Sequence, residues 1–276
     1  MGADTNFISP ETLVRVWFFA SIFFVMALIE KIAPRRILLK SKFKRWISNL
    51  GMQIIDVVVL RLIFPIFPVG LAVLCEQRGW GLLNYFHIIQ PVALIIGILA
   101  LDFIIYLQHR MFHITPLFWR VHKVHHTDQD IDVTTALRFH PLEIILSLLI
   151  KFAAVAAIGA PPLSVLIFEV LLNGASMFNH GNVGIPLSLD RIIRMVLVTP
   201  DMHRVHHSVI ARETNSNYGF SFSWWDRIFG TYKAQPQEGH EKMKIGLNGY
   251  HDDRSLQLSA LLTMPFVYQK RINDAE

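Results

Sequence analysis

Long apolar runs dominate the pattern of this 276-residue chain. Few charged residues interrupt the five longest, which cover 13–29, 54–74, 88–107, 142–158 and 163–178. A helix needs about 20 apolar residues to cross the hydrocarbon core of a bilayer, and the first three runs suit this length. The last two are shorter, and the sequence Gly159-Ala160-Pro161-Pro162 between them favours a helical hairpin. We therefore predict an all-α integral-membrane bundle of four to five membrane helices.

The composition supports this fold class over a soluble bundle. Only 17% of the residues are charged, against about 25% in soluble domains, and the mean hydropathy is +0.40. The net charge of +5 does not indicate nucleic-acid binding, because the basic residues flank predicted spans. Residues 31–45 contain seven basic side chains and no acidic one, which places this connection in the cytoplasm. The single cysteine, Cys75, allows neither a disulfide nor a thiolate cluster.

Eight of the thirteen histidines fall into three short clusters. These are His109 and His113; His122, His125 and His126; and His203, His206 and His207. The last two clusters are copies of one motif, H-[KR]-V-H-H-[ST]. Thr115-Pro116 and Thr199-Pro200 precede them, and Thr before Pro is typical of a helix start. Spacings of three and four residues suit one helical face, so we expect each cluster to point toward a common metal site large enough for two ions.

The alternation of predicted spans brings all three clusters to the cytoplasmic face, where they form a histidine-rich helical cap. Around them lie motifs that resemble those of the fatty acid hydroxylase / sterol desaturase superfamily, over about residues 90 to 232. The motifs are D-x3-Y-x2-H-R-x2-H (102–113), R-F-H-P-L-E (138–143), N-H-G-N (179–182), H-R-V-H-H-S (203–208), N-Y-G (217–219) and W-D-R-I-F-G-T (225–231). The second of these favours the sterol-desaturase-like branch.

We accordingly predict three segments. Residues 1–90 form N-terminal membrane helices and a basic cytoplasmic loop, residues 91–232 form the catalytic domain, and residues 233–276 form a tail with a possible surface helix.

The resemblance implies a membrane-bound non-haem di-iron oxidoreductase that uses O₂ and external electrons to hydroxylate or desaturate a lipid, whether sterol, fatty acyl or ether lipid. It implies nine metal ligands: His109, His113, His122, His125, His126, His180, His203, His206 and His207. Some relatives place another histidine four residues before the equivalent of His180, where this chain has Ser176.

The expected partners are a lipid from the bilayer and a separate electron donor, either a ferredoxin, a cytochrome b5-like protein or a reductase. A separate donor is expected because the sequence contains no haem-binding domain, no flavin domain and no GxGxxG after a strand.

Three further residues are candidates for catalytic roles. Asp102 lies seven residues before His109 on the same helical face, where it is expected to accept an imidazole N–H and fix the tautomer. His140 has three interpretations: a metal ligand, a residue that supports the ligands or contacts substrate, and a structural histidine. Asn179 is a weaker supporting candidate, as are Asn182 and Asp226.

Iron suits oxidation of an unactivated C–H bond, because zinc is redox-inactive, although zinc can replace iron in purified protein.

Two other classes of protein are weighed against this hypothesis. A membrane metal transporter would place polar ligands within its spans, whereas these histidines lie at the ends of spans and beyond them. A zinc-dependent membrane hydrolase would be expected to carry a glutamate within a motif such as HExxH, and no histidine cluster here contains one.

Overall fold

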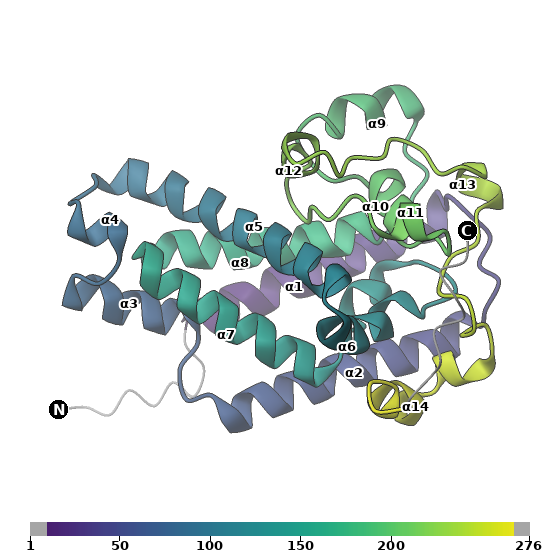
Figure 1. Ribbon diagram of the computed structural model, residues 1–276, viewed down its shortest axis with the longest axis horizontal. Helices are drawn as coiled ribbons and strands as arrows, with labels where there is room; N and C mark the ends of the chain where they lie inside the picture. Colours follow the sequence, from purple (N-terminus) through teal and green to yellow (C-terminus); the bar gives the residue numbers. More distant parts are fainter. Residues whose placement is uncertain (1–9, 268–276) are drawn as a thin grey trace.

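The computed structural model describes residues 10–267, so the ends of the first and last predicted segments lie outside the described residues. All regular elements in the described part are helices. The five longest lie roughly along the long axis of the molecule (Figure 1): α1 (Pro10–Ile32), α2 (Lys42–Ile63), α5 (Gln90–Ile114), α7 (Pro141–Ile158) and α8 (Pro162–Asn179). Five stretches are long and apolar enough to cross a membrane. The predicted all-α bundle is confirmed.

The predicted hairpin consists of α7 and α8. Gly159 ends α7 in the left-handed region, with φ 70°, and Pro162 is the first residue of α8. A Cβ atom on Gly159 would lie 2.6 Å from the carbonyl oxygen of Trp80, so a larger residue there would strain the backbone and also clash. The hairpin turn is therefore fixed against the segment that precedes α5.

The second predicted span differs from the structure. The apolar run at 54–74 is not one helix, because α2 ends at Ile63 and α3 (Pro68–Arg78) begins after a short break. Pro65 and Pro68 explain the break: proline lacks the backbone N–H that continues a helix, and it disfavours helical backbone in the residue before it. The helix α3 packs against the α7–α8 hairpin, and the short α4 (Leu82–Tyr85) follows it.

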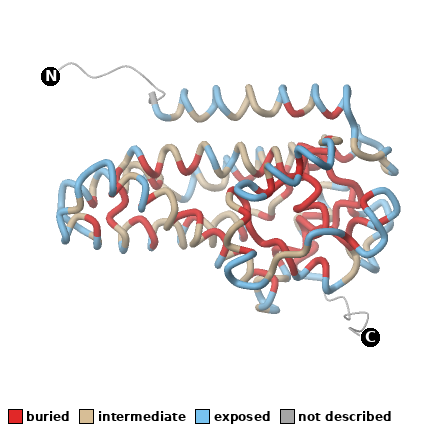
Figure 2. Tube along the Cα trace, turned by 90° about the horizontal axis from the view of Figure 1, so that it is seen from above, coloured by how far each residue is buried: buried red, intermediate tan, exposed pale blue. Residues whose placement is uncertain are grey.

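The remaining short elements gather at one end of the bundle and form the cap (Figure 1). They are α6 (Pro116–His126), η1 (Val133–Leu137), α9 (Leu187–Ile193), α10 (Pro200–His206), α11 (Ala211–Thr214), α12 (Trp224–Ile228), α13 (Gly239–Lys242), η2 (Asp253–Leu256) and α14 (Leu258–Thr263). Figure 2 shows that buried residues concentrate in this end, whereas α1 lies along one side with much of its length exposed.

A buried ion cluster joins α2 to the loop after α6. The guanidinium of Arg45 is fully buried, and it donates to both oxygens of Asp128, at 2.6 and 2.9 Å, and to Asp132. Burial alone would raise the pKa of the Asp128 carboxyl, but Arg45 outweighs burial and lowers the pKa to about 2. Arg45 was counted with the basic connection 31–45, whereas the structure places it in the first turns of α2, where it is buried.

A second buried arginine fixes the end of α6. Arg138 donates from Nε to the carbonyl of Val124 at 2.9 Å and from Nη2 to the hydroxyl of Thr127, also at 2.9 Å. The first bond satisfies a carbonyl in the last turn of α6, which the hydroxyl of Thr127 also contacts at 2.8 Å, and the second bond holds that hydroxyl at the C-cap. The direction of α6, and of the histidines on it, is therefore held from outside the helix.

The predicted C-terminal helix is present as α14 and packs on α2. Leu258 covers Gly51, where a Cβ atom would lie 2.8 Å from its side chain. Leu261 is completely buried, in a cluster with Met52 of α2 and Val124 of α6. The tail thus forms an outer wall behind the histidines of α6.

Candidate metal centre

The first histidine cluster closes a long helix, and each HxxHH motif lies toward the end of a short helix that starts at its Thr-Pro pair, as the sequence predicts. His109 and His113 occupy the last turns of α5, and α6 starts directly after Thr115 with Pro116 as its first residue. Thr199 caps α10, because its hydroxyl accepts from the N–H of Met202 at 3.3 Å. The side chain of Thr115 makes no such bond.

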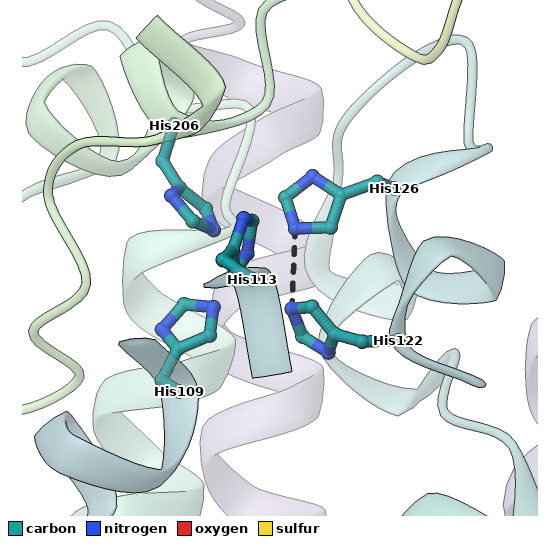
Figure 3. Close-up of side chains that lie close together, drawn as sticks. All are labelled: His109, His113, His122, His126 and His206. Atoms are coloured by element: carbon teal, nitrogen blue, oxygen red, sulfur yellow. Dashed lines mark hydrogen bonds between the residues drawn. The ribbon is translucent and has the colours of Figure 1, made fainter. Parts of the chain in front are cut away.

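Nine buried histidines form two groups. In each group the ligand atoms all lie within 4.8 Å of one another. The first group contains five residues, which face a common centre in Figure 3: His109, His113, His122, His126 and His206. The second group contains four: His125, His180, His203 and His207. The ring centroids of His126 and His207, one from each group, are 4.6 Å apart, so the two groups adjoin.

Each HxxHH motif is divided between the groups, so the expectation that a cluster points to one place is wrong. The outer pair of the first motif, His122 and His126, belongs to the group of five, while His125 belongs to the group of four. Consecutive residues of a helix point about 100° apart, which prevents adjacent histidines from reaching one centre.

The second motif is divided in the opposite sense. His203 and His207 join the group of four, and His206 joins the group of five. The two copies of the motif therefore build two adjacent centres.

Backbone carbonyls fix the tautomer of three imidazoles. A carbonyl only accepts, so a ring Nδ1 beside it carries the proton and leaves the Nε2 lone pair free. The bonds run from His109 to Tyr218 (2.8 Å), from His180 to Ser176 (2.7 Å) and from His206 to Ser216 (2.7 Å). These partners orient the free nitrogens toward the two centres.

A carboxylate fixes a fourth imidazole. Nδ1 of His122 lies 2.7 Å from Oε1 of Glu143, which is buried in the first turn of α7. Glu143 belongs to the R-F-H-P-L-E motif, which by itself assigns this carboxylate no role. The sequence shows a carboxylate shortly after a histidine-rich segment, but spacing alone does not indicate which imidazole this carboxylate contacts.

The remaining nitrogens show that the residues fit metal ions. Nε2 of His180 lies 3.0 Å from Nε2 of His125 and 3.0 Å from Nε2 of His203. Metal–imidazole bonds of about 2.0–2.1 Å, at right angles, would separate neighbouring ligand nitrogens by about 3 Å. Nε2 of His109, His113, His206 and His207 is buried without a hydrogen-bond partner. Buried polar atoms without partners are costly, and a bound cation would satisfy them.

The electrostatics also favour metal binding. Burial lowers the pKa of His122 to about 3 and that of His180 to about 4. Burial, together with neighbouring histidines, holds the pKa values of His125, His203 and His207 well below the usual range. These imidazoles are therefore neutral at pH 7, which is the form that binds metal.

Asp102 has a different partner from the one expected. Its Oδ2 accepts from Nε1 of Trp225 at 2.8 Å, whereas the Nδ1 of His109 is used by Tyr218. The expectation that Asp102 orients a ligand imidazole is therefore wrong, because a nearer backbone carbonyl fills that position. Asp102 instead joins α5 to α12, and any catalytic role for it remains a prediction.

His140 belongs to neither histidine group in the described part of the chain. Its Nδ1 accepts from the N–H of Leu142 and caps α7, and its Nε2 donates to the carbonyl of Leu262 at 3.1 Å. Of the three interpretations, the geometry favours the structural one. Asn179 donates to the carbonyl of Phe220 at 3.0 Å, so it fixes the segment that follows Tyr218.

The segment 216–219, whose carbonyls orient two histidines, is itself fixed by side chains that the sequence singled out. Asp226 accepts from the N–H groups of Tyr218 and Gly219, at 2.7 and 2.9 Å. Asn217 lies in the left-handed region, with φ 52°, and donates to the carbonyl of Met202 on α10. The N-Y-G and W-D-R motifs therefore act together, by positioning backbone.

Fold and site together define a helical membrane protein with a histidine-rich metal centre at one end of its spans. Residues 94–231 match the sequence profile of the family described as fatty acid hydroxylase. The chain belongs to this family, and it is an oxygen-dependent oxidoreductase. This membership favours an oxygenase over the transporter and hydrolase alternatives.

Several characterised proteins are similar to this chain. Ornithine lipid hydroxylase OlsE of Rhizobium tropici is 24% identical over 245 residues, which are 85% of this chain and 72% of that protein. Human alkylglycerol monooxygenase is 36% identical over 154 residues, 54% of this chain and 32% of that protein. Rat cholesterol 25-hydroxylase is 26% identical over 144 residues, 51% of this chain and 47% of that protein. No solved structure matches the chain.

Proposed function

We propose that this protein binds two iron ions and inserts one oxygen atom of O₂ into a C–H bond of a membrane lipid. The overall reaction consumes the lipid, O₂, two electrons and two protons, and it yields the hydroxylated lipid and water. The observation that carries this proposal is the pair of adjoining groups of five and four buried, neutral imidazoles at the head of apolar spans.

Each group of histidines would hold one ion. His109, His113, His122, His126 and His206 would bind the first, and His125, His180, His203 and His207 would bind the second. Iron bound there would supply the redox chemistry that activates O₂. The second group has one histidine fewer because Ser176, four residues before His180, is not a metal ligand. This centre would keep more room for O₂ or water.

The protein's own residues support this chemistry by excluding water and presenting an apolar approach. Phe220 lies between the histidines and the spans, with its ring centroid 4.9 Å from that of His109. Its other neighbours include Leu101 of α5 and Phe168 of α8, in one apolar cluster. We propose that the reacting part of a lipid reaches the centres from this side. Water would be the competing reactant, and the apolar packing disfavours it.

Hydroxylation is the reaction that the similar proteins favour, because the three described above are hydroxylases or monooxygenases. Desaturation and ether cleavage need the same oxidant and differ in how the substrate is held.

The basic residues between α1 and α2 favour a cytoplasmic position for the cap and its metal centre.

Oxygen labelling tests this function. Iron-loaded protein in nanodiscs that contain a bacterial lipid extract is reduced with dithionite and exposed to ¹⁸O₂, and the lipids are analysed by mass spectrometry. We expect a lipid that carries one ¹⁸O atom and is absent with His125→Ala. If iron is bound and reduced but no lipid gains ¹⁸O from O₂, the proposal is wrong.

A further inference from the structure

A groove of about 860 Å³ opens on the cap between the α1–α2 connection and the segment after α13. Its walls include Arg35, Arg36 and Lys40 on one side and Lys242 and Lys244 on the other. Both segments lie at the end of the molecule opposite the hairpin turn and α4 (Figure 1). Because the spans run along the long axis, this end faces the aqueous phase on the side of the metal centre.

The groove has more basic than acidic side chains in its walls. Five basic residues line it, against one acidic residue among the described ones, Glu241. Arg35 pairs with Glu241 and Asp201, and Lys40 pairs with Asp253 outside the groove, so the charge without a partner comes from the other side. Lys242 and Lys244 are exposed and have no ion-pair partner within residues 10–267.

Arg36 adds to this excess. It donates from Nη2 to the carbonyl of Met243 at 2.8 Å, while its Nη1 is buried without a partner. Such a cluster favours an anionic partner, because like charges held together raise the free energy of the isolated protein.

The floor of the groove touches the group of four histidines through the backbone. Gly246 donates to the carbonyl of His207 at 3.1 Å, and Val209 donates to the carbonyl of Lys244, also at 3.1 Å. Gly246 has φ 108°, and a Cβ atom there would lie 3.3 Å from the carbonyl oxygen of Asp128. A single backbone segment thus separates the groove from His207, a candidate metal ligand.

The groove's wall reaches the same group of histidines through ion pairs. Arg35 bonds to Asp201 at 3.2 Å, and Asp201 also pairs with Arg204, the residue that follows His203 on α10. A partner seated in the groove would therefore lie next to the metal centre without entering the substrate side.

We propose that this groove, defined by Arg35, Arg36, Lys40, Lys242 and Lys244, docks an acidic one-electron carrier protein that reduces the metal centre. The inference rests on the proposed function, which consumes two electrons for each O₂. Each docking event transfers one electron: the carrier is oxidised, and one metal ion is reduced. Two events complete a turnover.

A carrier protein suits the groove better than a lipid headgroup does. The residues of the groove belong to the α1–α2 connection and to the segment around α13, which lie at the cap end of the molecule (Figure 1), whereas lipid headgroups surround the spans. Exposed Ile37 and Leu39, on the same connection, place apolar surface within a charged rim. A small interface of this kind is typical of transient redox complexes, which form quickly through charge and dissociate readily.

Stopped-flow reduction tests the proposal, with full-length metal-loaded protein in nanodiscs. The probe is a reduced plant-type [2Fe–2S] ferredoxin, an acidic one-electron carrier, and dithionite serves as the small reductant. The test variant is Lys242→Glu/Lys244→Glu. The matched control is Arg78→Glu/Arg191→Glu, which makes the same charge change at exposed positions away from the groove.

We expect the groove variant to slow reduction by ferredoxin about tenfold or more at low salt, and to lose most of the salt dependence. Dithionite should reduce all three proteins at similar rates, and the control should behave like the unaltered protein. Equal ferredoxin rates for the groove variant and the control would overturn the proposal. A second result would also overturn the proposal: ferredoxin reduction rates that do not change, together with weaker binding of spin-labelled phosphatidylglycerol by the groove variant alone. That result would assign the groove to lipid.

Direct binding separates this inference from the proposed function. Affinity of oxidised ferredoxin for the protein in nanodiscs is measured by biolayer interferometry and needs no redox-active centre. If dithionite reduces no metal, the proposed function fails, while weaker ferredoxin binding by the groove variant alone still supports docking. If ferredoxin binds all three proteins equally, the docking proposal fails whatever the metal centre does.

Discussion

The spans and the cap differ in what they bury. In α1, Trp17, Phe24 and Ile32 are each more than 60% exposed, so most of their apolar surface is not covered by the protein and suits lipid. In α6, by contrast, the last six residues are all buried, and three of them are histidines. A span needs only apolar character and helical hydrogen bonding, whereas each polar group of the cap needs a particular partner. Substitutions should therefore be tolerated far better in the lipid-facing surface than in the cap.

The largest expected effect comes from removing one histidine of either group. His125→Ala removes a ligand from the group of four, and His206→Ala removes one from the group of five. We expect each to lower lipid oxidation about a hundredfold or more and to reduce bound metal, measured by product formation and elemental analysis. The isolated, exposed His87 provides the control, as His87→Asn, because asparagine tolerates its φ of 49°. Unchanged metal content and activity in both ligand variants would remove the basis for the site.

The next largest effect should come from the buried ion cluster. Arg45→Ala leaves Asp128 and Asp132 buried without their charge partner, which should cost about 3–5 kcal/mol of the free energy of unfolding. Thermal unfolding in nanodiscs measures this loss. The same change at an exposed ion pair, Arg254→Ala beside Asp252, should cause no measurable loss. Equal losses in both variants would contradict the distinction between buried and exposed pairs.

A smaller effect is expected from the carboxylate that orients His122. Glu143→Leu removes the acceptor from Nδ1 and should weaken metal binding about 10- to 100-fold, measured by competition with a chelator. Glu143→Gln keeps an acceptor and should recover most of the affinity.

Asp102→Asn provides a comparison, because Asp102 contacts Trp225 and not a histidine. It should leave the metal affinity nearly unchanged. An Asp102 variant that loses metal as readily as Glu143→Leu would reverse these assignments.

The smallest effect concerns pH. Folded His122 and His180 have pKa values of about 3 and about 4, below the unfolded value of about 6.5. The unfolded chain therefore binds more protons between these limits, so stability of the metal-free protein should fall as the pH is lowered. Between about pH 7.5 and 6.5 we expect a loss of a few tenths of a kcal/mol for each such histidine. Stability that rises on acidification would show that these rings are charged in the folded protein.

The same contrast explains how much of the fold could be predicted. The hairpin follows from apolar run length and from Gly159 and Pro162, and the end of α5 follows from Thr115-Pro116, all of which act locally. The break between α2 and α3 was missed because hydropathy continues through Pro65 and Pro68. Backbone chemistry stops the helix there, although the side chains remain apolar.

The site was less predictable in its details than in its residues. The nine histidines follow from motif and resemblance, but their division into groups depends on how α6 and α10 face one another. Arg45 and Asp128 are 83 positions apart in sequence. Glu143, in the first turn of α7, contacts His122 on α6. No local pattern encodes these pairs, because tertiary packing creates them.

The most direct test of the central claim is the metal content of protein expressed with excess iron, purified without oxygen and measured by elemental analysis and Mössbauer spectroscopy. The account predicts two irons for each chain, magnetically coupled when oxidised and altered by O₂. A single ion, or zinc alone after iron reconstitution, would contradict it.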